Sequence, residues 1–131
     1  MQILTIIGAV FLSLAALIHV YIFYLESIAW STPKTWKTFG LRSQSEADTV
    51  KPMAYNQGYY NGFLALGVIV GLVLITTNVA QAGYALAIFA GSSMVLAATV
   101  LITSNAKLAR AAVLQGAAPL IGVVLLVVSL L

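Results

Sequence analysis

The sequence has no cysteine and only one histidine, and it carries three acidic and six basic residues in a chain of 131. The absence of cysteine excludes disulfides, thiol chemistry, iron–sulfur clusters and cysteine zinc sites. A single histidine cannot supply a bis-imidazole haem or a two-histidine zinc motif, so we predict no metal site and leave the cofactor unknown. Six basic residues do not make an extended positive face, which argues against nucleic acid as a partner.

Apolar side chains dominate what remains. Hydrophobic residues make up 62% of the chain and charged residues 7%, whereas a water-soluble domain averages about 25% charged residues. This composition predicts an integral membrane protein with a single domain over residues 1–131. Four apolar segments predict spans at about residues 3–29, 52–77, 82–104 and 109–130. The predicted fold class is therefore all-α, a four-transmembrane-helix antiparallel bundle in contact with the lipid bilayer.

The segment between the first two spans holds most of the charge and must lie outside the hydrocarbon. Thr32 and Pro33 resemble an N-cap followed by the first position of a helix, and Gly40 supplies a stop. Trp36 and Phe39 would share one side of this short helix, as expected for a helix at the membrane interface. An irregular loop with two unrelated aromatic residues is an open alternative.

Further signals mark the ends and faces of the spans. Pro52 is expected to open the second span, and the short uncharged connection at residues 78–81 predicts a tight hairpin with the third. Gly58 and Gly62 are spaced like a small-residue packing pair, and the third span is rich in glycine, serine and alanine, which let helices approach closely. Pro119 lies inside the fourth span and frees a backbone carbonyl near Gln115.

All basic residues lie in two segments, residues 31–51 and 105–110. In an antiparallel bundle both segments fall on one side of the membrane, and the tendency of Lys and Arg to stay in the cytoplasm identifies that side. We therefore expect both termini outside. The first residues lack the Lys or Arg of a signal-peptide n-region, and the apolar segment is longer than usual for cleavage, so we expect a retained first span.

Ionisable and amide side chains gather toward the cytoplasmic ends of three spans. His19 and Glu26 are seven residues apart, which returns a helix to nearly the same face, at about 10 Å along its axis. Such groups need partners in hydrocarbon. The candidate ligand-binding residues of a cytoplasmic-facing polar pocket are His19, Glu26, Asn56, Gln57, Asn61 and Gln115.

Each of these residues also has a structural interpretation. His19 could form a hydrogen bond to a neighbouring span, and Glu26 could be solvated or paired with Arg110. Gln57 and Asn61, four residues apart, could hold helices together through hydrogen bonds. The sequence leaves these alternatives open.

Three stretches carry a family resemblance. They read His-Val-Tyr-Ile-Phe-Tyr-Leu-Glu over 19–26, Asn-Gln-Gly-Tyr-Tyr-Asn-Gly-Phe-Leu-Ala over 56–65, and Gly-Ala-Ala-Pro-Leu-Ile-Gly-Val over 116–123. At these residues the chain resembles a family of small bacterial membrane proteins known as domain of unknown function 1304. The resemblance covers nearly the whole chain and implies a short four-span protein of the bacterial inner membrane. It implies no function.

The leading functional hypothesis is a protein that binds a small polar ligand or a lipid headgroup in the polar pocket. A proton-coupled transporter similar to the small multidrug resistance family, which also has four short spans and an essential glutamate, is an alternative. The complete Lys and Arg bias argues against that mode of assembly. A membrane-embedded lipid or isoprenoid enzyme, with His19 and Glu26 as acid and base, is a further alternative, as are a homo-oligomer and a structural subunit of a larger complex.

Overall fold

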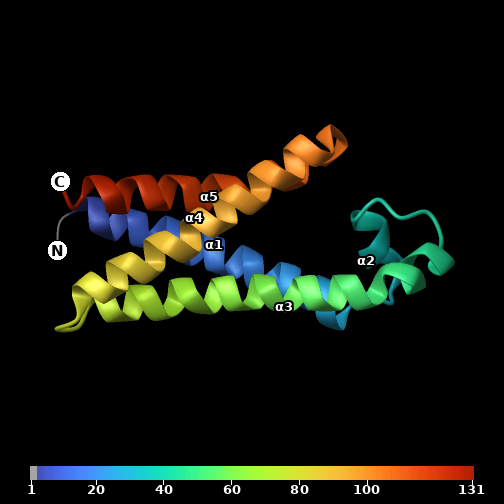
Figure 1. The fold of residues 1–131 in the computed structure, drawn as a ribbon, viewed down its shortest axis with the longest axis horizontal. Helices are drawn as coiled ribbons and strands as arrows, with labels where there is room; N and C mark the ends of the chain where they lie inside the picture. Colours follow the sequence, from blue (N-terminus) through green and yellow to red (C-terminus); the bar gives the residue numbers. More distant parts are fainter. Residues whose placement is uncertain (1–2) are drawn as a thin grey trace. The chain divides into compact units, whose positions relative to one another are not determined.

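The structure is a computed structural model that describes residues 3–131, and helices form nearly all of it (Figure 1). No strand occurs within these residues. Four helical segments are long and apolar enough to cross a membrane, in agreement with the four predicted spans: Ile3–Ile28, Gln44–Ile75, Ala80–Ser104 and Ala106–Val128. The elements are α1 (Ile3–Phe23), the π-helix η1 (Tyr24–Ile28), α2 (Pro33–Thr38), α3 (Gln44–Ile75), α4 (Ala80–Ser104), the 3-10 helix η2 (Ala106–Leu108) and α5 (Ala109–Val128).

The helices contribute to two compact units, and α1 and α3 each contribute to both. One unit is His19–Phe63, here called the polar unit, which holds seven of the nine Asp, Glu, Lys and Arg residues. The other, here called the apolar unit, comprises the chain up to Ile18 together with Leu64–Leu131.

The short helix α2 begins and ends as the sequence predicts. Thr32 is its N-cap residue and Pro33 occupies its first turn. At its end Gly40 has a φ of +81°, a left-handed conformation that glycine adopts without steric cost. The amide of Gly40 donates to the carbonyl of Lys37 at 3.0 Å and that of Leu41 to the carbonyl of Trp36 at 3.3 Å. This pair of bonds is the Schellman arrangement that closes a helix.

Helix α3 begins eight residues earlier than predicted. We expected Pro52 to open this helix, but it lies inside α3, which starts at Gln44. The Ser43 hydroxyl accepts the amide of Glu46 at 3.2 Å, and the Glu46 carboxylate accepts the amide of Arg42 at 2.8 Å. Ser43 and Glu46 have the spacing of a capping box, a start signal that outweighs Pro52 because a proline costs one internal hydrogen bond while a satisfied cap stabilises the first turn.

Two tryptophans form the core of the polar unit. Trp30 and Trp36 are buried with Ala47 and Ala54. The indole Nε1 of Trp30 donates to the carbonyl oxygen of Ala47 at 2.9 Å, and that of Trp36 donates to Oε1 of Gln44 at 3.2 Å. These contacts hold the connecting segment and α2 against the first turns of α3.

The apolar unit is held together by small residues. A Cβ added at Gly83 would lie 2.7 Å from the carbonyl oxygen of Gly71, and one added at Gly71 would lie 2.6 Å from the amide nitrogen of Ala87. A Cβ at Gly122 would come within 2.7 Å of Cγ of Leu12. These approaches bring the helix backbones close together, as the small residues of the third span predicted.

Candidate functional site

The candidate site begins where α1 turns into a π-helix. Over Tyr24–Ile28 the backbone widens, and the amide of Ala29 donates to the carbonyl of Tyr24, five residues earlier, at 2.9 Å. We expected a single α-helix here. Single π turns inside helices are rare and are frequent at functional sites. The wider turn contains Glu26, the acidic residue that the sequence singles out.

Glu26 and Asn61 form a buried pair between η1 and α3. Their side chains are 8% and 7% exposed. Asn61 Nδ2 donates to Oε2 of Glu26 at 2.9 Å and also to the carbonyl oxygen of Gln57 at 3.1 Å. The bond to the Gln57 carbonyl orients the Asn61 amide, so that its other N–H points at the Glu26 carboxylate.

A glycine allows η1 to approach α3 closely. A Cβ at Gly58 would meet the hydroxyl of Ser27 and would lie 3.0 Å from both Cβ of Glu26 and the amide nitrogen of Ser27. The Ser27 hydroxyl donates to the carbonyl oxygen of Tyr55 at 2.9 Å, next to this contact. Gly58 therefore plays the packing role that its spacing from Gly62 predicts, and it seats the π-helix beside Asn61.

Aromatic rings lie next to the pair. The rings of Phe23 and Tyr59 meet edge to face with centroids 5.1 Å apart, and a Cβ at Gly62 would lie in ordinary contact with Phe23, at 3.5 Å. The hydroxyl of Tyr55 donates to that of Tyr59 at 3.3 Å. Phe23 directly precedes η1, and Tyr55 and Tyr59 lie on α3, so these rings belong to the two segments that also carry Glu26 and Asn61.

His19 is also buried in the polar unit. Its side chain is 1% exposed, and it has an interaction partner within the fold. His19 and Glu26, the two ionisable residues of this segment, are thus both buried.

The remaining sequence candidates are placed differently. Asn56 and Gln57 are exposed on α3, and only the backbone carbonyl of Gln57 takes part in the Glu26–Asn61 arrangement. Gln115 is half-buried on α5 and belongs to the apolar unit. The structure thus joins two of the six predicted residues, Glu26 and Asn61, by a direct side-chain hydrogen bond.

The side-chain donor to Glu26 in the polar unit is a neutral amide. Arg110 belongs to the apolar unit, so its suggested pairing with Glu26 stays a prediction. Residues 3–131 do not bring three His, Asp or Glu side chains together as they would be around a metal ion. The Glu26 carboxylate can accept up to about four hydrogen bonds, and one neutral amide supplies the side-chain donor.

Comparison with known proteins identifies the family. The family described as "Protein of unknown function (DUF1304)" matches residues 13–127. The chain belongs to this family. Among curated proteins, the uncharacterized protein YpaA of Lactococcus lactis subsp. lactis (strain IL1403) is 41% identical to this chain over 70 residues. That alignment covers 53% of this chain and 56% of YpaA, and no solved structure matches. The resemblance seen in the three sequence stretches is confirmed.

Proposed function

We propose that this DUF1304 protein binds a small polar ligand or a lipid headgroup at Glu26 and Asn61. One observation carries the proposal: the carboxylate of Glu26 is buried within a membrane-capable helix, and a neutral amide is its side-chain partner. A carboxylate taken out of water needs a proton, a cation or several donors. A ligand that brings an ammonium or several N–H or O–H groups would meet this need.

The proposed setting is a bacterial inner membrane. In this arrangement the four long helices run antiparallel, and α2 lies at the cytoplasmic interface with Lys34 and Lys37 exposed beside it. Both termini are then outside. Glu26 lies at the cytoplasmic end of the first span, from which a soluble ligand or an inner-leaflet headgroup could reach it.

Molecules that copurify with the protein would test this proposal. The wild type, Glu26→Gln and the exposed-carboxylate control Glu46→Gln are purified from bacterial membranes, and bound lipids and metabolites are measured by mass spectrometry. We expect one species to accompany the wild type and Glu46→Gln and to fall at least tenfold in Glu26→Gln. Equal recovery from all three proteins would contradict the proposal.

A ligand of known chemistry gives a second measurement. Phosphatidylethanolamine carries an ammonium with three N–H donors, whereas phosphatidylcholine carries a quaternary ammonium with none. If a headgroup ammonium binds Glu26, phosphatidylethanolamine raises the melting temperature of the wild type more than phosphatidylcholine does, and Glu26→Gln loses this difference. The absence of any difference in the wild type excludes the headgroup form of the proposal.

A proton-coupled transporter is the second candidate, favoured by the same buried carboxylate with a neutral amide as its side-chain donor. Such a protein would release protons when a lipophilic cation such as tetraphenylphosphonium is added, and Glu26→Gln would release none. No proton release from the wild type would remove this candidate and leave ligand binding untouched. The one-sided distribution of Lys and Arg already argues against a transporter that assembles in both orientations.

A further inference from the structure

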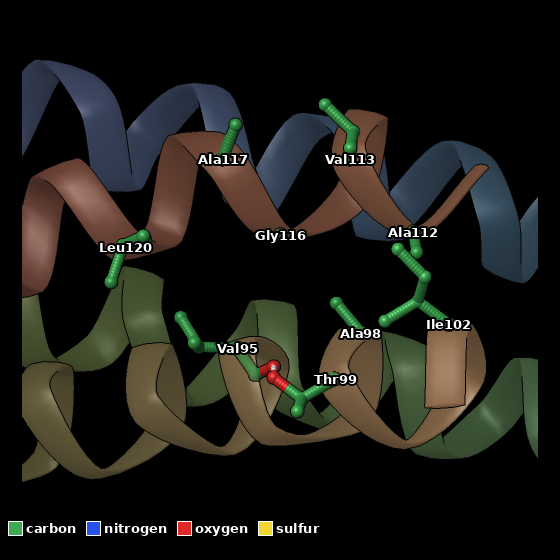
Figure 2. Close-up of a pocket in the computed structure, with 9 residues that line it drawn as sticks. All are labelled: Val95, Ala98, Thr99, Ile102, Ala112, Val113, Gly116, Ala117 and Leu120. Atoms are coloured by element: carbon green, nitrogen blue, oxygen red, sulfur yellow. Dashed lines mark hydrogen bonds between the residues drawn. The ribbon is translucent and has the colours of Figure 1, made fainter. Parts of the chain in front are cut away.

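A second candidate binding site lies in the apolar unit, between α4 and α5. The two helices pack against each other (Figure 1), and along their contact a groove of about 260 Å³ opens. Figure 2 shows its lining from both helices. Among the lining residues are Val95, Ala98 and Ile102 on α4 and Ala112, Gly116 and Leu120 on α5.

The floor of the groove is closed by small residues. A Cβ at Gly116 would lie 2.7 Å from Cβ of Ala98, so the helices nearly touch at this point. Val95 and Leu120 extend from opposite helices toward the space between them (Figure 2). The groove therefore lies beside the close contact of Gly116 with Ala98, and the larger side chains of Val95 and Leu120 line it.

The lining of the groove is apolar apart from one threonine. The only polar side chain in its lining is Thr99, whose hydroxyl already donates to the carbonyl oxygen of Val95 at 2.9 Å. An engineered apolar cavity of roughly 150 Å³ stays free of water and binds benzene. A larger groove without free polar groups is suited to a hydrocarbon chain.

The charge of this region lies at one end of the groove. Ile102 and Ala112 lie near the link between α4 and α5. Lys107 is on this link and Arg110 is in the first turn of α5, and both are exposed. They are the only charged residues between Ala80 and Leu131. The Asn105 side chain accepts the amide of Lys107 at 3.1 Å and shapes the turn that presents them.

We propose that the α4–α5 groove binds one acyl chain of an anionic phospholipid, with the lipid phosphate at Lys107 and Arg110. The hydrocarbon fills the hollow, and the two cations neutralise the phosphate at its end. Basic residues at the ends of membrane helices commonly bind anionic headgroups. The site is independent of Glu26 and of the function proposed above.

The headgroup half of the site is tested with phosphatidylglycerol as the anionic probe and phosphatidylcholine as the zwitterionic control. Binding to detergent-purified protein is measured by native mass spectrometry. Lys107→Gln/Arg110→Gln should weaken phosphatidylglycerol binding about thirty-fold, since each basic residue near a membrane surface contributes about a factor of five. The matched control Lys34→Gln/Lys37→Gln should leave binding unchanged. Equal loss in both double variants would show a general surface attraction and overturn the proposal.

The acyl-chain half of the site is tested by filling the groove. Val95→Phe should reduce phosphatidylglycerol binding at least fivefold, while Val100→Phe, on the exposed lipid-facing side of the same helix, should not. If Val95→Phe fails to fold, Leu120→Phe fills the groove from α5. Unchanged binding in a folded filled variant overturns the proposal. A second outcome also overturns the proposal: the wild type is a dimer, Val95→Phe dissociates it, and phosphatidylglycerol binding persists. In that case a second copy of the chain would occupy the groove.

Discussion

The two compact units of this chain solve the same packing problem with different chemistry. In the apolar unit, helices meet at glycine and alanine, and a side-chain hydrogen bond joins the hydroxyls of Thr5 and Tyr84, 3.1 Å apart. In the polar unit, Trp30 and Asn61 bond across segments far apart in the sequence. Close approach of two helix backbones leaves no room for other groups between them. Hydrogen bonds, by contrast, fix the positions of the particular side chains that form them.

This difference explains why the candidate ligand site lies in the polar unit. A small-residue contact has no group with which to recognise a polar ligand, but a buried carboxylate held by one amide does. Each unit is therefore tested by a different kind of substitution: removal of a buried indole tests the polar unit, and addition of a methyl group at a helix contact tests the apolar unit.

The largest effect is expected for Trp30→Ala. The substitution removes a buried ring and the bond to Ala47, and replacing a buried aromatic residue by alanine costs about 3–5 kcal/mol. The control Tyr60→Ala removes an exposed ring and should cost far less. Denaturant titration in detergent measures the free energy of unfolding of both variants. Similar decreases in this free energy would show that Trp30 does not belong to the core.

A smaller but sharper effect is expected for Gly83→Ala. The new methyl group would lie 2.7 Å from the carbonyl oxygen of Gly71, a backbone atom that cannot move cheaply, and overpacking costs about 1–3 kcal/mol. Gly62→Ala meets only Phe23 at 3.5 Å and should be neutral or stabilising, because alanine is the better helix former. Thermal unfolding of both proteins checks this, and a reversed order of their melting temperatures would refute the close approach.

Asn61→Leu should lower stability by about 1–3 kcal/mol, since it leaves the buried carboxylate of Glu26 without its side-chain donor. Adding Glu26→Leu removes the carboxylate too and should recover part of the loss. The control Asn56→Leu changes an exposed amide. A rise in stability of Asn61→Leu with unchanged ligand recovery would argue that the pair has no binding role.

The smallest effect is expected for Tyr84→Phe. It removes one hydrogen bond, to Thr5, and such bonds between membrane helices average about 0.6 kcal/mol. Denaturant titration should therefore place it near the wild type. A loss above about 2 kcal/mol would show that the apolar unit depends on directional bonds, and the contrast between the units would disappear.

Much of the fold was predictable because its signals are local. Four apolar segments indicate four helices, and Thr32, Pro33 and Gly40 mark both ends of α2 through caps and backbone conformation. The start of α3 has an equally local signal, the Ser43 and Glu46 capping box, which the prediction of a start at Pro52 did not include. The π-helix had no such signal, and its close contact with Gly58 joins residues far apart in the sequence.

The candidate site was predictable in part for the same reason. The free-energy cost of burying polar groups in a membrane made Glu26 and Asn61 candidates, and a hydrogen bond links their side chains in the structure. Helical spacing could not tell which face of α3 meets η1, so Asn56 and Gln57 were grouped with Asn61 although their side chains are exposed. The groove between α4 and α5 could not be predicted, because its lining residues are the small and aliphatic types found throughout membrane helices.

The most direct test is an experimental structure of the wild-type protein crystallised from a lipidic phase that contains bacterial lipids. Its electron density beside the carboxylate of Glu26 and the amide of Asn61 is the decisive feature. We predict density other than water within hydrogen-bonding distance of Glu26, absent from an isomorphous Glu26→Gln crystal. A carboxylate in contact only with protein atoms and water, with the same density in both crystals, would contradict a binding role for the polar unit.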